Sequence, residues 1–407
     1  MHEAPLGAGL WSSVYLASPT AAGKPLSLET PPATPVRRRG QSNSVSSTDS
    51  YTTQLSSSTS SSTYIPRATE TSASAVWAIK APADRAAFSV IRSEARMLTH
   101  IFSHTSPTAY MVPFLGLDPR TGGLLMHALP LTLEDFIRGD LASIQEDQRT
   151  RIVASIFPDL AAKLLTGLEW LHEGAGVIHA DIKPSNILLR PTRPGVTAAM
   201  LQQRVRASLT EGPLERPTLL VHSSSSNDSE DNGVIDFEPL YTDFSAAIPT
   251  HAFPSPSPSD PTSPPSSPRN AATGPPPHLA GGTWDFLAPE LCRLHPAPAL
   301  PSPASDVYAL GVALLVLALG ESPFDGLAAG NAFRKREMVK TGDAVGFAKA
   351  CGGGGGAGGR FARVKAEVGR LRGGDGGWDW EGWLRRGLAK SAAVRVGAGE
   401  WRRELRV

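Results

Sequence analysis

The sequence predicts an α+β fold in which strands dominate the first part of the ordered chain and helices dominate the rest. Residues 76–80 alternate with a period of two, as a strand does, and residues 124–129 form a short apolar run typical of a buried strand. Residues 90–101 instead carry apolar side chains three and four positions apart, which indicates a helix. The apolar run 307–319 is too short to span a bilayer and predicts a buried core helix.

Low-complexity segments separate these ordered parts. They are rich in Ser, Pro or Gly and hold few large apolar side chains, so we expect them to be disordered inserts. The inserts cover about residues 18–74, 191–233, 249–278 and 351–377. Because loop-closure entropy grows slowly with length, a sheet tolerates the first insert between its second and third strands. Once the inserts are set aside, the ordered length suits a single domain, so we expect the 407-residue chain to form one domain over 1–407.

The composition limits the classes of partner. Lys and Arg total 39 and Asp and Glu total 38, a balance that argues against binding to nucleic acid or to a membrane. The two cysteines, Cys292 and Cys351, lie far apart and show no disulfide framework or metal spacing. No signal-peptide pattern opens the chain. We therefore expect an intracellular monomer, cytoplasmic or nuclear, whose N-terminal sequence could be incomplete.

Residues 177–189 carry the strongest chemical signal. Two short apolar runs flank a polar loop that holds Asp181, Lys183 and Asn186. These side chains provide a base, a cation and a neutral metal ligand, which together suit phosphoryl transfer. The simpler interpretation is a polar turn between two strands, because Asp, Pro, Ser and Asn are all turn formers.

Three further features suit a phosphate-binding site. Gly7 and Gly9 allow the backbone to approach phosphates closely, although a plain hairpin turn is the default for such a pair. No Gly-Lys-Ser/Thr sequence follows them, which disfavours a P-loop NTPase. Lys80 shares a strand face with small Ala78, and Glu94 falls within the apolar stripe of the next helix, where a carboxylate needs a partner. The alternatives are a lysine that reaches solvent at a strand end and an exposed glutamate.

Residues 181–186 closely resemble the catalytic loop of eukaryotic protein kinases, in the Asp-x-Lys-Pro-x-Asn form of the Ser/Thr kinases. Residues 76–80 are similar to the kinase Val-Ala-Ile-Lys strand, and Ala288-Pro289-Glu290 to the Ala-Pro-Glu motif. The resemblance covers essentially all ordered segments, in the family's order. It implies a bilobal protein-kinase-like fold, with a small β-rich N-lobe over about 1–127, a mainly helical C-lobe over about 130–407, and ATP between them.

The resemblance also implies a role for each residue. Asp181 would deprotonate the Ser or Thr hydroxyl of a protein substrate and Lys183 would stabilise the transferring phosphoryl group, while Lys80, fixed by Glu94, would hold the α- and β-phosphates. Asn186 and Asp243 would hold Mg²⁺. The remaining ATP contacts implied are Leu6, Gly7, Gly9, Val14, Ala78, the gatekeeper Met126, the carbonyl of His127 and the N–H of Leu129.

Two aspartates compete for the kinase Asp-Phe-Gly position. Asp243 is favoured because small Ser245 follows its phenylalanine, whereas bulky Glu238 follows the phenylalanine after Asp236. In the helical lobe, the resemblance implies that Asp306 accepts backbone N–H groups of the catalytic loop and that Arg395 pairs with Glu290.

Three departures keep a second hypothesis open. Ser12, Ala180 and Ser245 stand where kinases usually carry Gly, Arg and Gly. They favour a pseudokinase, a nucleotide-binding or scaffold protein without phosphoryl transfer. A mainly disordered interaction hub would account for the inserts but not for the ordered motifs. Because the arginine missing at position 180 normally receives an activation-segment phosphate, we expect activity to be independent of such phosphorylation.

Overall fold

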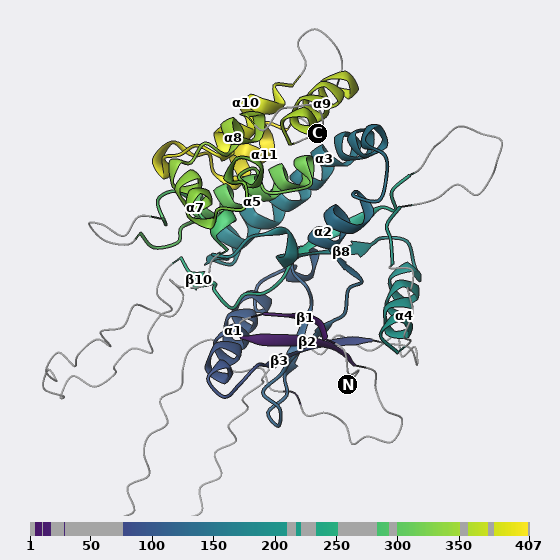
Figure 1. Cartoon of the computed structure of the whole chain (residues 1–407). Coiled ribbons are helices and arrows are strands. Elements are labelled where there is room, and N and C mark those ends of the chain that lie inside the picture. Colours follow the sequence, from purple (N-terminus) through teal and green to yellow (C-terminus); the bar gives the residue numbers. More distant parts are fainter. Residues whose placement is uncertain are drawn as a thin grey trace, which may run out of the picture.

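The computed structural model describes residues 5–9, 11–17, 28, 76–209, 217–220, 233–250, 283–292, 299–350, 357–372 and 378–405. It is a mixed α/β structure with a five-stranded sheet and many helices, compatible with the bilobal expectation (Figure 1). In Figure 1 the sheet and helix α1 lie on one side of the molecule and most of the helices on the other. Most of the predicted inserts 18–74 and 249–278 lie outside the described residues, so their disorder stays a prediction.

The larger sheet is antiparallel, in the order β1-β2-β3-β5-β4. Its strands are β1 (Pro5–Ala8), β2 (Ser12–Ala17), β3 (Trp77–Pro82), β4 (Phe114–Leu117) and β5 (Leu124–His127). The alternation predicted for β3 is confirmed, because Ala78 and Lys80 are buried while Trp77 and Ile79 are half-buried. Helix α1 (Ala87–Phe102) turns its apolar stripe inward, and Glu94 is buried within that stripe.

Two small sheets carry the loops of the candidate site. Strands β6 (Leu131–Thr132), β8 (Ile187–Pro191) and β9 (Phe237–Tyr241) pair in that order, and β7 (Val177–Ile178) pairs with β10 (Ile248–Pro249). The two apolar runs that flank the catalytic-loop motif are therefore β7 and β8. Thr132 caps α2 (Leu133–Asp135), since its side chain and that of Asp135 form a capping box. A π-helical turn (Phe136–Asp140) follows α2.

The helical part is built around α3 (Glu146–Glu169) and α5 (Pro303–Leu319). A π-helical turn (Trp170–Gly174) extends α3. Helix α5 is buried from Ser305 to Leu319, as its uniformly apolar sequence predicts, and Ser302 caps it. The remaining helices are α6 (Asp325–Ala328), α7 (Ala332–Thr341), α8 (Ala344–Ala350), α10 (Trp380–Gly387) and α11 (Ala398–Arg403).

Two predicted inserts contain regular structure, which corrects the expectation of disorder across them. Helix α4 (Val196–Leu209) lies in the insert 191–233, and Met200 and Leu201 on it are buried. Helix α9 (Ala357–Leu371) lies in the insert 351–377, where buried Phe361, Val364 and Val368 recur three and four positions apart. The expectation of disorder rested on overall composition and overlooked these short apolar stripes.

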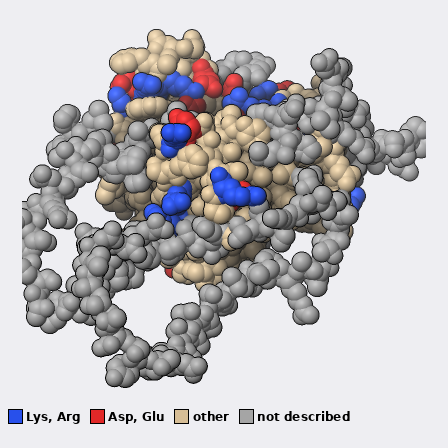
Figure 2. Space-filling model, turned by 90° about the horizontal axis from the view of Figure 1, so that it is seen from below, with Lys and Arg blue, Asp and Glu red and all other residues tan. Residues whose placement is uncertain are grey.

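Charged side chains of both signs lie on the surface of the molecule. Figure 2 shows basic and acidic side chains side by side along one rim of the molecule, in keeping with the balanced composition. Among the residues described, no helix is long and apolar enough to cross a membrane. Cys292 is free and buried, and Cys351 lies outside the described residues.

Candidate active site

Asp306, in the first turn of α5, holds the catalytic-loop motif from within the helical part. Its carboxylate is almost completely buried and accepts backbone N–H groups from His179 at 2.7 Å and Ala180 at 2.9 Å. His172 Nε2 lies 3.0 Å from the same carboxylate. These contacts fix Ala180 in a left-handed conformation with φ of 65°, which costs a non-glycine residue about 1–2 kcal/mol. The loop is therefore held in one strained geometry, and the contact predicted for Asp306 is present.

Lys183 and Asn186 both contact the carboxylate of Asp181. Lys183 Nζ lies 2.7 Å from Asp181 Oδ2, and Asn186 Nδ2 donates to the same oxygen at 3.1 Å and to the Asp181 carbonyl at 2.8 Å. Because the amide nitrogen of Asn186 is engaged in this way, its oxygen is the atom left to serve as a metal ligand. The loop thus places a base, a cation and an amide oxygen within six residues, and a 3₁₀ turn at Pro184–Asn186 carries the last of them.

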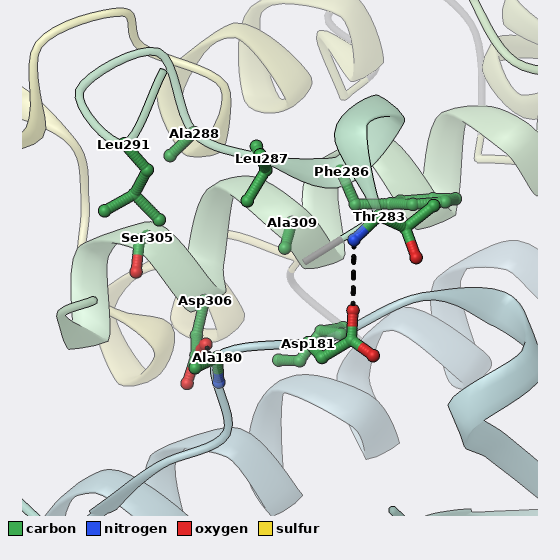
Figure 3. A pocket seen from close by; sticks show the side chains of 11 residues that line it. Ala180, Asp181, Thr283, Phe286, Leu287, Ala288, Leu291, Ser305, Asp306 and Ala309 are labelled. Atoms are coloured by element: carbon green, nitrogen blue, oxygen red, sulfur yellow. Dashed lines mark hydrogen bonds between the residues drawn. The ribbon is translucent and has the colours of Figure 1, made fainter. Parts of the chain in front are cut away.

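Thr283 joins this group from a segment about a hundred residues later in the chain. Its hydroxyl lies 3.1 Å from Lys183 Nζ, and its backbone N–H donates to Asp181 Oδ1 at 3.4 Å (Figure 3). Beside this contact Phe286, Leu287 and Leu291 line a small pocket that Figure 3 shows next to Asp181. Thr283 was not among the site residues predicted from the sequence. Its only sequence signal is a hydroxyl residue five positions before Ala288, inside the segment that resembles the end of the kinase activation segment.

A second cluster joins Lys80 to two carboxylates. Lys80 Nζ lies 2.8 and 2.7 Å from the two oxygens of Glu94 and 2.7 Å from Asp243 Oδ1. Glu94 also accepts the backbone N–H of Phe244 at 3.1 Å. The Lys80–Glu94 pair expected from the sequence is therefore present and buried, and it is tied directly to Asp243.

Charge and burial set the protonation of this cluster. Burial alone would lower the pKa of Lys80, but the two carboxylates outweigh it and raise that pKa above its ordinary value. Burial would likewise raise the pKa of Asp243, but the charge and hydrogen bond of Lys80 hold it well below its usual range. For Glu94, burial dominates over the Lys80 charge and the pKa is raised. Asp243 is thus the carboxylate that stays ionised most firmly.

The geometry separates the two Asp-Phe candidates. Asp243 lies just after β9 in a left-handed conformation, with φ of 62°, and the phenylalanine after it is buried. The side chain of Asp236, before β9, is exposed, and its carbonyl accepts the backbone N–H of Thr192. His179 connects the favoured segment to the catalytic loop, because its ring lies 4.8 Å from that of Phe244 and its Nε2 lies 3.0 Å from the Thr242 carbonyl. This link through His179 was also missed from the sequence.

The residues predicted to contact the base of ATP fall into two apolar clusters. Ala78 is buried in one cluster, with Val14 packed against it, and Met126 and Leu129 are buried in the other. The His127 side chain is exposed, in keeping with a backbone contact alone. Gly9 donates its N–H to the Ser12 carbonyl at 2.7 Å and closes a tight turn, and Gly7 is exposed. Leu6 lies in β1, and its side chain is outside what the structure describes.

The predicted pair of Arg395 with Glu290 is present. Its two N–O contacts measure 2.8 and 3.0 Å, and the Arg395 side chain is fully buried. The guanidinium also donates to the carbonyls of Ala304 and Ala389 and lies over the Tyr308 ring. This pair anchors the segment after Thr283 to the helical part and so keeps Thr283 near Asp181.

Comparison with known proteins finds short similarities to protein kinases. The chain is 39% identical over 61 residues to mitogen-activated protein kinase kinase 1c of Physcomitrium patens, a match that covers 15% of this chain and 17% of that protein. It is 42% identical over 52 residues to a probable serine/threonine-protein kinase of Schizosaccharomyces pombe, a match that covers 13% of this chain and 6% of that protein. No model of a known protein family matches the chain. These partial similarities suggest the protein kinase class.

Proposed function

We propose that this protein is an ATP-dependent protein serine/threonine kinase. The observation that carries the proposal is the meeting of Lys80 on β3, Glu94 on α1 and Asp243, far later in the sequence, through contacts of 2.7 to 2.8 Å. Asp243 is joined in turn to the catalytic loop, because the N–H of Thr242 donates to the Asn186 carbonyl at 3.0 Å. These contacts support a site in which Lys80 would bind phosphates, Asp243 would bind the metal and Asp181 would act as the base for a hydroxyl.

The donor set fits a Mg²⁺ ion bound together with a nucleotide. Asp243 offers an ionised carboxylate and Asn186 an amide oxygen, and magnesium takes one or two such ligands along with phosphate oxygens and water. The described residues hold no group of three or more His, Cys, Asp or Glu side chains arranged for a metal, so a site built by protein alone does not fit. When bound, Mg²⁺ neutralises charge on the phosphates.

Asp181 is proposed to accept the proton of the substrate hydroxyl and to orient its oxygen. Lys183, held between Asp181 and Thr283, supplies positive charge beside the phosphoryl group that moves. Lys80 grips the non-transferred phosphates, while Glu94 fixes the direction of its ammonium group. The apolar pocket next to Asp181 would receive a substrate side chain that neighbours the hydroxyl residue.

The second candidate is a pseudokinase that binds nucleotide or serves as a scaffold. One observation favours it: the ammonium of Lys80 lies directly on Asp243, so the phosphate ligand and the metal ligand engage each other. Ser12, Ala180 and Ser245, which differ from the residues usual in kinases, also favour the pseudokinase. Both candidates retain the fold and differ only in phosphoryl transfer.

Transfer of labelled γ-phosphate to a generic basic protein tests the proposal. We expect Mg²⁺-dependent labelling of Ser and Thr by the purified protein, identified by phosphoamino acid analysis, and none by Asp181→Asn. Equal background from the two proteins would rule out the kinase. Retained binding of Mg-ATP in that case would identify the pseudokinase.

We expect Thr283→Val to slow transfer by about tenfold, the value of one lost hydrogen bond. The variant removes the hydroxyl that lies 3.1 Å from Lys183 Nζ and keeps the shape of the side chain. Thr283→Ser retains the hydroxyl and should stay within about twofold of the parent. Steady-state transfer rates at saturating Mg-ATP provide the measurement, and equal rates for the Val and Ser variants would remove Thr283 from the site.

We also expect phosphatase treatment to leave the transfer rate unchanged. Ala180 offers no cation to an activation-segment phosphate, and its N–H is already used by Asp306. The purified protein would be treated with phosphatase, freed of phosphate as judged by mass spectrometry, and assayed. Loss of activity that returns on rephosphorylation would contradict this expectation.

A further inference from the structure

Helix α4 lies in the segment between β8 and β9, and neither the motifs nor the proposed chemistry accounts for it. Figure 1 shows it beside the larger sheet, next to the ends of its strands. Its sequence places apolar residues at 196, 200, 201 and 205, a stripe of helical period among polar neighbours. A helix with such a stripe covers an apolar surface.

The surface that α4 covers is the one predicted to bind the nucleotide base. Leu201 is only 4% exposed and belongs to a small buried cluster with Leu16, Ala78 and Ala128. Val14 and Val205 pack against the same cluster. Val14 and Ala78 are the residues expected to cover the base, so side chains of α4 share a cluster with both of them.

Other contacts hold α4 across the two parts of the molecule. Met200, next to Leu201, is buried in the main core. The guanidinium of Arg204 lies 3.6 Å from the carboxylate of Asp135, in the short helix α2. That ion pair is partly exposed and contributes little, so apolar burial is the main force that holds α4 in place.

We propose that α4 is an autoinhibitory cap that competes with the nucleotide base for the apolar surface of Val14 and Ala78. This inference rests on the proposed function, because it takes that surface as the base site. Ala78 is buried and Val14 is partly buried in the cluster that Leu201 joins, so the helix must move away before a flat ring can cover both residues and Mg-ATP can bind fully. The apparent affinity for nucleotide is then reduced by the fraction of molecules in which the helix is displaced.

Displacement of the cap provides the test. Leu201→Asp puts a charge into the cluster and should release α4, whereas Gln202→Asp puts the same charge at the adjacent exposed position. Gln202→Pro breaks the helix without touching a buried side chain, and Gln202→Ala is its control. Circular dichroism and thermal unfolding establish that each protein is folded. Calorimetric titration with Mg-ATP measures binding without any need for transfer.

We expect Leu201→Asp and Gln202→Pro to bind Mg-ATP about tenfold more tightly than the parent, with both controls within about twofold. Amide exchange over residues 197–205 of the parent should speed up when Mg-ATP saturates it. Equal affinities for Mg-ATP across the folded variants, with unchanged amide exchange, would overturn the proposal that α4 is an autoinhibitory cap. The proposed kinase activity would be unaffected by that result. No nucleotide binding by any folded variant would overturn both. Tighter binding without phosphoryl transfer would support the cap and refute the kinase.

Discussion

Asp181→Asn is expected to slow phosphoryl transfer by about 10²- to 10⁴-fold, the usual contribution of a positioned general base. The amide keeps the size of the carboxylate but cannot take a proton from the hydroxyl. Lys183 Nζ, now 2.7 Å from Asp181 Oδ2, would also lose its anionic partner. Affinity for Mg-ATP should change by less than about threefold, because the predicted contacts with phosphate and base come from other residues. Single-turnover transfer and calorimetric titration measure the two quantities.

Asp236→Asn is the matched control for this variant. It makes the same chemical change in an exposed side chain of the described chain, away from Lys80. Its transfer rate should stay within about twofold of the parent. If instead Asp236→Asn abolished transfer and Asp243→Asn did not, the choice between the two Asp-Phe segments would be wrong.

Contacts that depend on local chemistry were the ones open to prediction. A carboxylate within an apolar helical stripe requires a partner, and the resemblance to kinases implied that the partner of Glu94 is Lys80, a contact that the structure contains. The period of β3 likewise indicated which face holds Ala78 and Lys80. The Asp306 and Arg395 contacts were expected only because their neighbours resemble kinase motifs, and the geometry contains both.

Contacts that depend on how distant segments pack were not open to prediction. Thr283 meets Lys183 in a segment that is held by the pairs of Glu290 with buried Arg395 and of Asp285 with Lys335. Helices α4 and α9 were hidden by the composition around them. In each helix a few apolar side chains are buried against residues from other parts of the chain. A sequence window that averages over Ser, Gly and charged neighbours gives no account of such a surface.

Lys80→Met is expected to destabilise the protein by about 3–5 kcal/mol and to abolish measurable transfer. The methionine fills the space but leaves Glu94, which is 1% exposed on its side chain, and Asp243 without their shared cation. An uncompensated buried charge carries most of that cost. Lys365→Met is the control, since Lys365 is 46% exposed and its pair with Glu381 should contribute less than about 1 kcal/mol. Urea unfolding measures both.

The double variant Lys80→Met/Glu94→Gln separates the structural role of Lys80 from its proposed role on phosphate. Replacing Glu94 by a neutral amide removes the orphaned carboxylate, so we expect about half of the lost stability to return. The amide still accepts the backbone N–H that Phe244 now donates to Glu94 at 3.1 Å, which keeps the Asp243 segment in place. Transfer should remain absent, because no cation is left to bind the phosphates. Recovery of transfer along with stability would mean that Lys80 serves only as the partner of Glu94, and the phosphate role would have to pass to another residue.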